Sequence, residues 1–373
     1  MFSFKGKIKK VLAEADILID GARAWDIQVH DERLYRRVFA RGSIGLVESY
    51  MDGWWDCKKL DEFFYRILRG RLHTKNEVPG QALFHLLSNI INRQTERRSL
   101  EVGERHYDIG NDLYKAMLDK RMVYSCGYWG GNPPAGGLDA AQENKLDLIC
   151  RKLNLKAGQK VLDIGCGWGS FAKFASEKYG VHVTGITISK EQAALGKELT
   201  KGLPVDIKFL DYRKIKGVFD RIVSIGMFEH VGHKNYRTFM KIADRHLKDD
   251  GIFLLHTIGG NYSGTRVDPW IEKYIFPNGE IPNVEYIGKA IEEIFVIEDW
   301  HNFGADYDKT LMAWQKNFEM NWDKLKGRYS ERFRRMWNYY LLACAAEFRS
   351  RDSQLWQIVF TKSGILGGYK SIR

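Results

Sequence analysis

The sequence lacks long apolar runs. It contains no stretch of about eighteen consecutive apolar residues, the length that a membrane-spanning helix requires. Its first seven residues, MFSFKGK, have neither the apolar stretch nor the small-residue cleavage site of a secretory signal peptide. We therefore expect a cytoplasmic protein. The 373 residues, 44% of them hydrophobic, suffice for one large domain or two ordinary ones with a substantial core.

Cysteine is scarce as well. The chain has five cysteines, scattered at positions 57, 126, 150, 166 and 344 without any Cys-x-x-Cys spacing. A disulfide framework and a structural zinc site are therefore not expected.

Acidic residues are outnumbered by basic ones. There are 47 Asp and Glu residues against 58 Lys and Arg residues, which gives a net charge of +11. This balance favours contact with nucleic acid or an anionic membrane surface, although it also serves solubility. The 11 tryptophans and 18 tyrosines suit a membrane interface, base stacking or an ordinary core. Because no nucleic-acid-binding module is evident, we expect no nucleic-acid partner.

Composition and periodicity divide the chain into three parts. Residues 1–85 show helical spacing of apolar residues and are predicted to form a small, mainly helical domain. Residues 86–105 are polar and charged, which is typical of a linker, and residues 106–373 are predicted to form the catalytic domain. In that last part, strand candidates alternate with helical patterns. They lie at residues 160–164, 182–186, 205–210, 221–225 and 252–257. The alternation predicts an α/β fold with a mainly parallel sheet and helices on both faces.

A glycine-rich stretch, VLDIGCGWGS at residues 161–170, follows the first strand candidate and precedes a helical pattern. Strand, tight turn and helix N-terminus together favour a nucleotide-type ligand, although glycine turns also end strands for structural reasons alone. After the next strand the chain has Thr187 where dinucleotide folds usually place an acid. Gln192 either bonds a ribose or lies on a helix surface, and Ser189 is equally suited to cap a helix.

Other candidates follow the later strands. Asp211 either accepts a hydrogen bond from an adenine amine or caps a helix. Glu229 and His230 form either an acid–base pair or a buried ion pair, and a lone histidine such as His256 is more often a packing residue than a base. A third metal ligand beside the two histidines is not evident, so no metal is predicted.

These motifs taken together resemble a known family. VLDIGCGWG, GITIS, DYR, GMFEHVG and LLHTIG are similar to the class I S-adenosylmethionine-dependent methyltransferases, whose sheet is Rossmann-like. YSCGYW, FEHVG, HTIG and GADY, with the N-terminal GSIGLVESYMDGWWDC, more narrowly resemble the bacterial cyclopropane fatty acid synthases. The resemblance extends from about residue 15 to residue 360.

The resemblance implies a reaction and its partners. A methyl group passes from S-adenosylmethionine to the cis double bond of an unsaturated acyl chain in a membrane phospholipid. A bound bicarbonate then removes a proton from the resulting carbocation, and the products are a cyclopropane fatty acyl phospholipid and S-adenosylhomocysteine. We accordingly expect peripheral association with the inner face of the membrane, a lipid-binding role for residues 1–85 and for the basic, aromatic segment Arg332–Trp337, and a homodimer.

The resemblance also implies site residues. The bicarbonate cradle would comprise Cys126, Glu229, His256, the backbone of Ile258, and Tyr307. Within it, Glu229 would accept a proton from the ion or orient His256. The methyl donor would be held by Tyr124, Ser125, Asp163, Gly165, Cys166, Gly167, Gly169, Thr187, Ile188, Ser189, Gln192, Asp211, Tyr212 and Arg213.

Two further predictions concern the carbocation and a last cysteine. Aromatic faces that would stabilise the cation are those of Tyr128, Trp129, Phe228, Tyr274 and Tyr307. Cys344 is a further catalytic candidate, but the apolar helix around it favours a packed, inert thiol. The alternatives to ring formation are a related lipid methyltransferase that makes a methyl-branched chain, and a silent lipid-binding relative.

Overall fold

The computed structural model describes residues 4–72, 110–130, 134–262 and 267–373. They form two compact units. The first comprises the described residues up to 72 together with 267–277 and 308–352, and the second comprises the rest. This division differs from the predicted one, because two segments from late in the chain belong to the N-terminal unit. The predicted linker at 86–105 lies outside the described residues.

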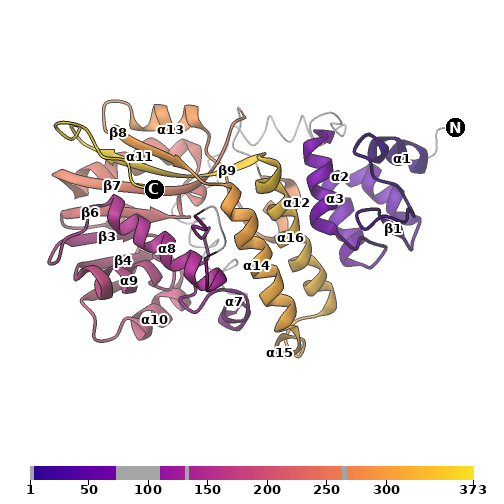
Figure 1. Ribbon diagram of the computed structural model, residues 1–373, viewed down its shortest axis with the longest axis horizontal. Helices are drawn as coiled ribbons and strands as arrows, with labels where there is room; N and C mark the ends of the chain where they lie inside the picture. The colour runs from indigo at the N-terminus through magenta and orange to yellow at the C-terminus, as the bar shows by residue number, and fades with distance from the viewer. Residues whose placement is uncertain (1–3, 73–109, 131–133, 263–266) are drawn as a thin grey trace. The chain divides into compact units, whose positions relative to one another are not determined.

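The second unit is built on a seven-stranded sheet in the order β5-β4-β3-β6-β7-β9-β8 (Figure 1). Its strands are β3 (Lys160–Ile164), β4 (His182–Thr187), β5 (Val205–Phe209), β6 (Phe219–Ile225), β7 (Leu247–Gly260), β8 (Val296–Asn302) and β9 (Ser353–Thr361). The first five pair in parallel, whereas β9 is antiparallel to both β7 and β8. The predicted mainly parallel sheet is confirmed, and β8 and β9 are strands that the sequence pattern did not indicate.

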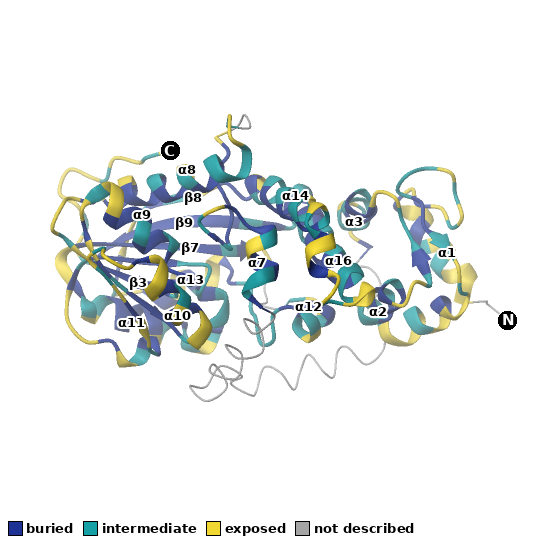
Figure 2. Ribbon diagram, turned by 90° about the horizontal axis from the view of Figure 1, so that it is seen from below, coloured by how far each residue is buried: buried dark blue, intermediate teal, exposed yellow. Residues whose placement is uncertain are grey.

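Helices cover both faces of this sheet (Figure 1). One face packs against α8 (Gly137–Lys152), α9 (Ser170–Tyr179) and α10 (Lys190–Leu199), and the other against α11 (Tyr236–His246) and α13 (Val284–Ile291). Neighbouring strand residues face opposite cores, as Val161 and Leu162 do. Because apolar side chains occupy both faces, the central strands are buried along most of their length (Figure 2).

Short elements lie at the carboxyl ends of the strands or precede the sheet. They are α7 (Asn111–Met117) and the 3₁₀ helices η1 (Tyr212–Lys214), η2 (Phe228–His230) and η3 (His233–Asn235). Carboxyl ends are the binding edge of such sheets, so η1 and η2 place their side chains where a ligand is expected.

The first unit is mainly helical, as predicted. Its elements are α1 (Phe4–Glu14), β1 (Gln28–Val29), α2 (Arg33–Met51), β2 (Trp55–Asp56), α3 (Leu60–Arg69), α12 (Pro269–Tyr274), α14 (Ala305–Met320), α15 (Trp322–Leu325) and α16 (Glu331–Ser350). The boundary between the units falls inside α14, after Tyr307. The apolar stripe of α3 packs on α16, with the rings of Phe64 and Tyr339 4.7 Å apart. Among the described residues, no helix is both long and apolar enough to cross a membrane.

The segment Arg332–Trp337 of α16 makes ion pairs within the first unit, and its contact with lipid stays a prediction. The Arg332 guanidinium pairs with Asp52 at 3.0 Å, and Arg335 pairs with Asp56 at 2.6 Å. Trp337 is fully buried. The charges and the largest ring of this segment are thus largely engaged within the first unit, where they hold α16 against the N-terminal residues.

Candidate active site

The glycine loop between β3 and α9 is shaped by a close approach. Gly165 has φ +84°, and a Cβ added to it would lie 2.5 Å from Cβ of Met227 in the loop after β6. The N–H groups of Gly165 and Cys166 both donate to the carbonyl of Ile186 in β4, at 2.9 Å. Gly167 and Gly169 also have positive φ. Glycine therefore lets the ends of three strands converge at this loop.

The polar residues after β4 are mostly buried and hydrogen-bonded to one another. Ser189 is the N-cap of α10, with its Oγ accepting from the backbone N–H of Gln192 at 3.2 Å. The Thr187 hydroxyl donates to Oε1 of Gln192 at 2.8 Å. Gln192 is only 4% exposed, which excludes the helix-surface alternative. Ile188 lies between these residues and is partly exposed. The capping role of Ser189 is confirmed, and its contact with a ligand stays a prediction.

Asp211 caps η1 after β5. Its Oδ1 accepts from the backbone N–H of Arg213 at 2.8 Å, and its Oδ2 accepts from the Arg213 guanidinium at 2.8 Å. The hydroxyl of Tyr212 is buried without a hydrogen-bond partner, and burial raises its pKa to about 12. The capping alternative is confirmed, and a contact of this group with adenine stays a prediction.

Ser125 accepts hydrogen bonds from two side chains of α8. Gln142 Nε2 donates to its carbonyl at 2.8 Å, and Lys145 Nζ donates to its Oγ at 2.9 Å. Both α8 side chains are 0% exposed. Tyr124, the preceding residue, packs edge-on against Tyr114 of α7 at 5.1 Å. Sequence reasoning missed Gln142 and Lys145, and the available signal was two polar residues on the buried face of a helix.

Asp163 ends β3 as a buried acid. It is 1% exposed, and neither of its carboxylate oxygens has a hydrogen-bond partner in the part of the chain that the structure describes. Burial raises its pKa to about 7, against the opposing effect of the Lys145 charge. A cationic partner would favour the ionised form of this carboxyl group.

Glu229, in η2 after β6, contacts the backbone of β7. Its Oε1 accepts from the N–H of Ile258 at 2.7 Å, and among the described residues its Oε2 is buried without a hydrogen-bond partner. Burial raises its pKa to about 7. The carboxyl group therefore changes protonation near neutral pH, as a group that exchanges a proton requires.

His256 of β7 is held by Gln357, the residue directly opposite on β9. Nε2 of the Gln357 amide lies 3.3 Å from Nδ1 of the ring. Because the amide donates, the ring hydrogen is on Nε2, which is buried without a partner. Burial lowers the pKa of His256 well below its ordinary value, so the ring is neutral. The sequence did not indicate Gln357, because it lies in a strand that was not predicted.

Three of the predicted cradle residues share one apolar cluster. Cys126 is buried in it with Phe303, and Ile258 and Tyr307 pack against it. The ring of His256 lies 5.9 Å from that of Phe303. Glu229 joins through its bond to Ile258. The structure thus brings together all five predicted residues from four separate segments of the second unit.

Other candidates are not members of this cluster. Cys344 in α16 and Tyr274 in α12 belong to the first unit, and burial raises the pKa of the Cys344 thiol well above its ordinary value. Phe228 is fully buried and stacks on Tyr236 at 4.1 Å, as a core residue does. Burial lowers the pKa of His230 to about 4, so this ring is neutral near pH 7.

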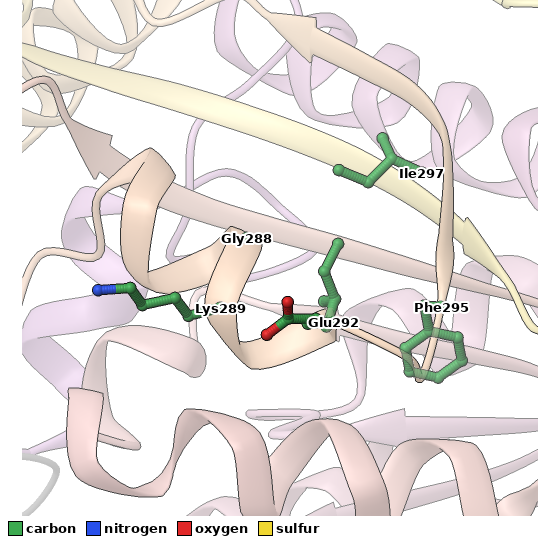
Figure 3. A pocket seen from close by; sticks show the side chains of 6 residues that line it. Gly288, Lys289, Glu292, Phe295 and Ile297 are labelled. Carbon is green, nitrogen blue, oxygen red and sulfur yellow. The ribbon is translucent and has the colours of Figure 1, made fainter.

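An open hollow of about 490 Å³ lies elsewhere in the second unit, between α13 and the start of β8 (Figure 3). It is lined by Gly288, Lys289, Ile291, Glu292, Phe295 and Ile297. None of these is a predicted site residue, and they offer no acid–base pair aimed at a common point.

Known sequences are similar to this chain over most of its length. The family model described as mycolic acid cyclopropane synthetase matches residues 94–358. The chain is 51% identical over 367 residues to a cyclopropane-fatty-acyl-phospholipid synthase of Escherichia coli (strain K12), covering 98% of this chain and 94% of that protein. It is 39% identical to a probable fatty acid methyltransferase of Pseudomonas putida, covering 72% of this chain and 70% of that protein.

Solved structures are similar to this chain as well. A cyclopropane synthase from Mycobacterium tuberculosis matches with a TM-score of 0.66 and 31% identity, covering 70% of this chain and 98% of that chain. A mycolic acid cyclopropane synthase complexed with S-adenosylhomocysteine matches with a TM-score of 0.66 and 32% identity, over 70% of this chain and 98% of that one. The chain has the class I methyltransferase fold and belongs to the mycolic acid cyclopropane synthetase family.

Proposed function

We propose that the chain transfers the methyl carbon of S-adenosylmethionine to the cis double bond of an unsaturated acyl chain in a membrane phospholipid and closes a cyclopropane ring. The observation that carries the proposal is the pair of buried, unpartnered atoms Glu229 Oε2 and His256 Nε2 beside the cluster of Cys126 and Tyr307. These are groups able to accept and donate protons at the binding edge of a methyltransferase sheet. The 51% identity over 98% of the chain to a cyclopropane-fatty-acyl-phospholipid synthase supports it.

The reaction balances without a covalent enzyme intermediate. The π electrons of the olefin attack the methyl carbon, the C–S bond breaks, and its electron pair stays on sulfur as S-adenosylhomocysteine. A cation forms at the other olefinic carbon. Loss of a proton from the transferred methyl group leaves the electron pair that closes the ring. An olefin is a weak nucleophile, so alignment of the two substrates must supply much of the rate, up to roughly 7–11 kcal/mol.

The cluster around Cys126 suits a cation in a dry site. Tyr128 packs edge-on against Phe303 at 5.3 Å, and Tyr307 packs against the same cluster. An aromatic face stabilises a desolvated cation by about 1–2 kcal/mol. A site walled by rings also excludes the water that would trap the cation as an alcohol.

The buried polar atoms fit a small anion such as bicarbonate. Nε2 of His256 carries a hydrogen, and the thiol of Cys126 and the phenol of Tyr307 are further donor types. Bicarbonate, when bound, supplies a base for the methyl proton. Glu229 would be the residue able to accept a proton at this point, since Gln357 already orients His256. The N–H of Ile258 donates to Glu229, so an anion at this point shares that donor or replaces the carboxylate there.

A second candidate function is transfer to a lipid without ring closure, giving a methyl-branched chain. The relatives that favour it are the fatty acid methyltransferase of Pseudomonas putida and a sphingolipid C9-methyltransferase of Emericella nidulans, the latter 34% identical over 69% of this chain.

One experiment separates these functions. The protein is incubated with vesicles of an unsaturated phospholipid and S-adenosylmethionine carrying a ¹³C methyl group, and the acyl chains are analysed by mass spectrometry and NMR. We expect the label in a ring methylene. Label in a methyl branch supports the second candidate, and absence of label in lipid refutes both.

The membrane association and assembly of the chain are further parts of the proposal. We propose that the chain binds anionic membrane surfaces peripherally through its net charge of +11, and that it works as a homodimer. Vesicle sedimentation across a salt series tests the first part, because electrostatic binding weakens as salt rises. Light scattering of the purified protein measures the second.

A further inference from the structure

Lys145 is a buried cation that forms no ion pair within 4.0 Å among the described residues. Its side chain is 0% exposed, and in the part of the chain that the structure describes, its Nζ has one hydrogen-bond partner, Ser125 Oγ at 2.9 Å. Lys152, about two turns further along α8, is buried to the same extent. It has Asp299 at 3.5 Å and His301 at 3.1 Å. Two equally buried lysines of one helix thus differ in that only one is paired within the fold.

A buried charge without a counter-charge costs several kcal/mol, so folds seldom keep one without a ligand to match it. The groups whose charges act on Lys145 are Asp119, Cys126 and Asp163. Asp163 is itself buried, with neither carboxylate oxygen hydrogen-bonded. The second unit therefore holds a buried ammonium and a buried carboxylate that are not joined to each other. That arrangement is complementary to a zwitterion.

We propose that Lys145 is a positioning residue for the amino-acid end of the methyl donor: it orients the Ser125 hydroxyl toward the α-carboxylate and supplies the counter-charge. The hydrogen bond between Lys145 and Ser125 determines which group the Ser125 hydroxyl can bind. Because Ser125 Oγ accepts from Lys145, its own hydrogen is free to donate to a ligand. Gln142 fixes the carbonyl of the same residue at 2.8 Å, so the hydroxyl cannot turn away with the backbone.

The titration of Lys145 and Asp163 predicts how the affinity for the methyl donor depends on pH. Burial lowers the pKa of Lys145 to about 8 and raises that of Asp163 to about 7. Affinity for a carboxylate held at Ser125 therefore falls as the pH rises above about 8, where the lysine loses its proton. Affinity for the α-ammonium falls as the pH drops below about 7, where the aspartate gains one.

The test compares two ligands that differ at one end. S-adenosylhomocysteine carries the amino-acid group, and 5′-methylthioadenosine is the same thioether nucleoside without it. In Lys145→Met we expect binding of S-adenosylhomocysteine, measured by titration calorimetry, to weaken about 10- to 100-fold. Binding of 5′-methylthioadenosine should change less than about two-fold. Lys152→Met is the matched control, and it should leave the ratio of the two affinities unchanged.

Every other outcome overturns the proposal. If Lys145→Met weakens the binding of both ligands equally, Lys145 has a structural role. If it leaves the binding of S-adenosylhomocysteine unchanged, Lys145 does not supply the counter-charge. In the wild type, the loss of S-adenosylhomocysteine affinity above pH 8 should be present, and in Lys145→Met it should be absent. If the methionine variant does not fold, Lys145→Gln gives the same comparison with a polar side chain. The inference about Lys145 rests on the proposed function only for the identity of the methyl donor. The proposed function is refuted if no cyclopropane product forms, whereas the role of Lys145 is judged by the binding measurements.

Discussion

Replacing Glu229 by glutamine isolates the proton-accepting role of its carboxyl group. The amide oxygen can still accept from the N–H of Ile258, which in the wild type lies 2.7 Å from Oε1. The change removes only the negative charge and the titration. We therefore expect Glu229→Gln to fold and to bind the methyl donor normally, with turnover lowered about 10²- to 10⁴-fold, the range of general acid–base groups.

The structure also fixes the effect on stability. Burial raises the pKa of Glu229 from its ordinary 4.5 to about 7, which corresponds to at most about 3 kcal/mol. Because the pKa of Glu229 is raised in the folded state, this group contributes fully to the stability of the wild type below its ordinary pKa. That contribution is lost as the pH rises through about 7. In urea unfolding, Glu229→Gln should thus gain stability relative to the wild type between about pH 5 and pH 8, by no more than that amount.

The assays are turnover against pH with labelled methyl donor and unfolding at the two pH values. Wild-type turnover should fall below about pH 7, where Glu229 is protonated, and this limb should vanish in the variant. Glu285→Gln is the control, because that carboxylate is exposed and pairs with Lys289 on the same helix, α13. A variant that keeps more than half of wild-type turnover, or the same limb near pH 7, would refute the reasoning.

Three other substitutions are predicted from the same geometry. Tyr307→Phe should lower turnover about 10- to 100-fold while leaving the KM for the methyl donor unchanged, because its ring still packs in the Cys126 cluster; steady-state kinetics measures both. Gly165→Ala should weaken binding of S-adenosylhomocysteine and lower the melting temperature, since its Cβ would lie 2.5 Å from that of Met227 at φ +84°; affinity unchanged in calorimetry would contradict this. Cys344→Ala should keep turnover within about two-fold, because burial raises the thiol pKa well above its ordinary value; a hundred-fold loss would restore it as a catalytic candidate.

Much of the second unit followed from local sequence. The strand candidate at residues 160–164 agrees residue for residue with β3, because apolar runs bounded by a glycine turn are local signals. The glycine loop and Glu229 were found by their position after strands, and His256 by its position near the end of a strand candidate, since parallel strands end at a common edge. What the sequence alone established was therefore the fold class, the binding edge and the residue types offered there, and the resemblance supplied the reaction.

Tertiary structure decided the partners of those residues. Gln357 reaches His256 because β9 pairs antiparallel with β7, a contact between residues 101 positions apart that periodicity does not reveal. The sequence does not distinguish Lys145 from Lys152 on α8, yet Lys145 donates a hydrogen bond to Ser125 and Lys152 forms an ion pair with Asp299. Membership of residues 308–352 in the N-terminal unit is likewise non-local. Burial and charge pairing depend on which segments meet after folding, and the free energy of a buried group depends on those neighbours more than on its own identity.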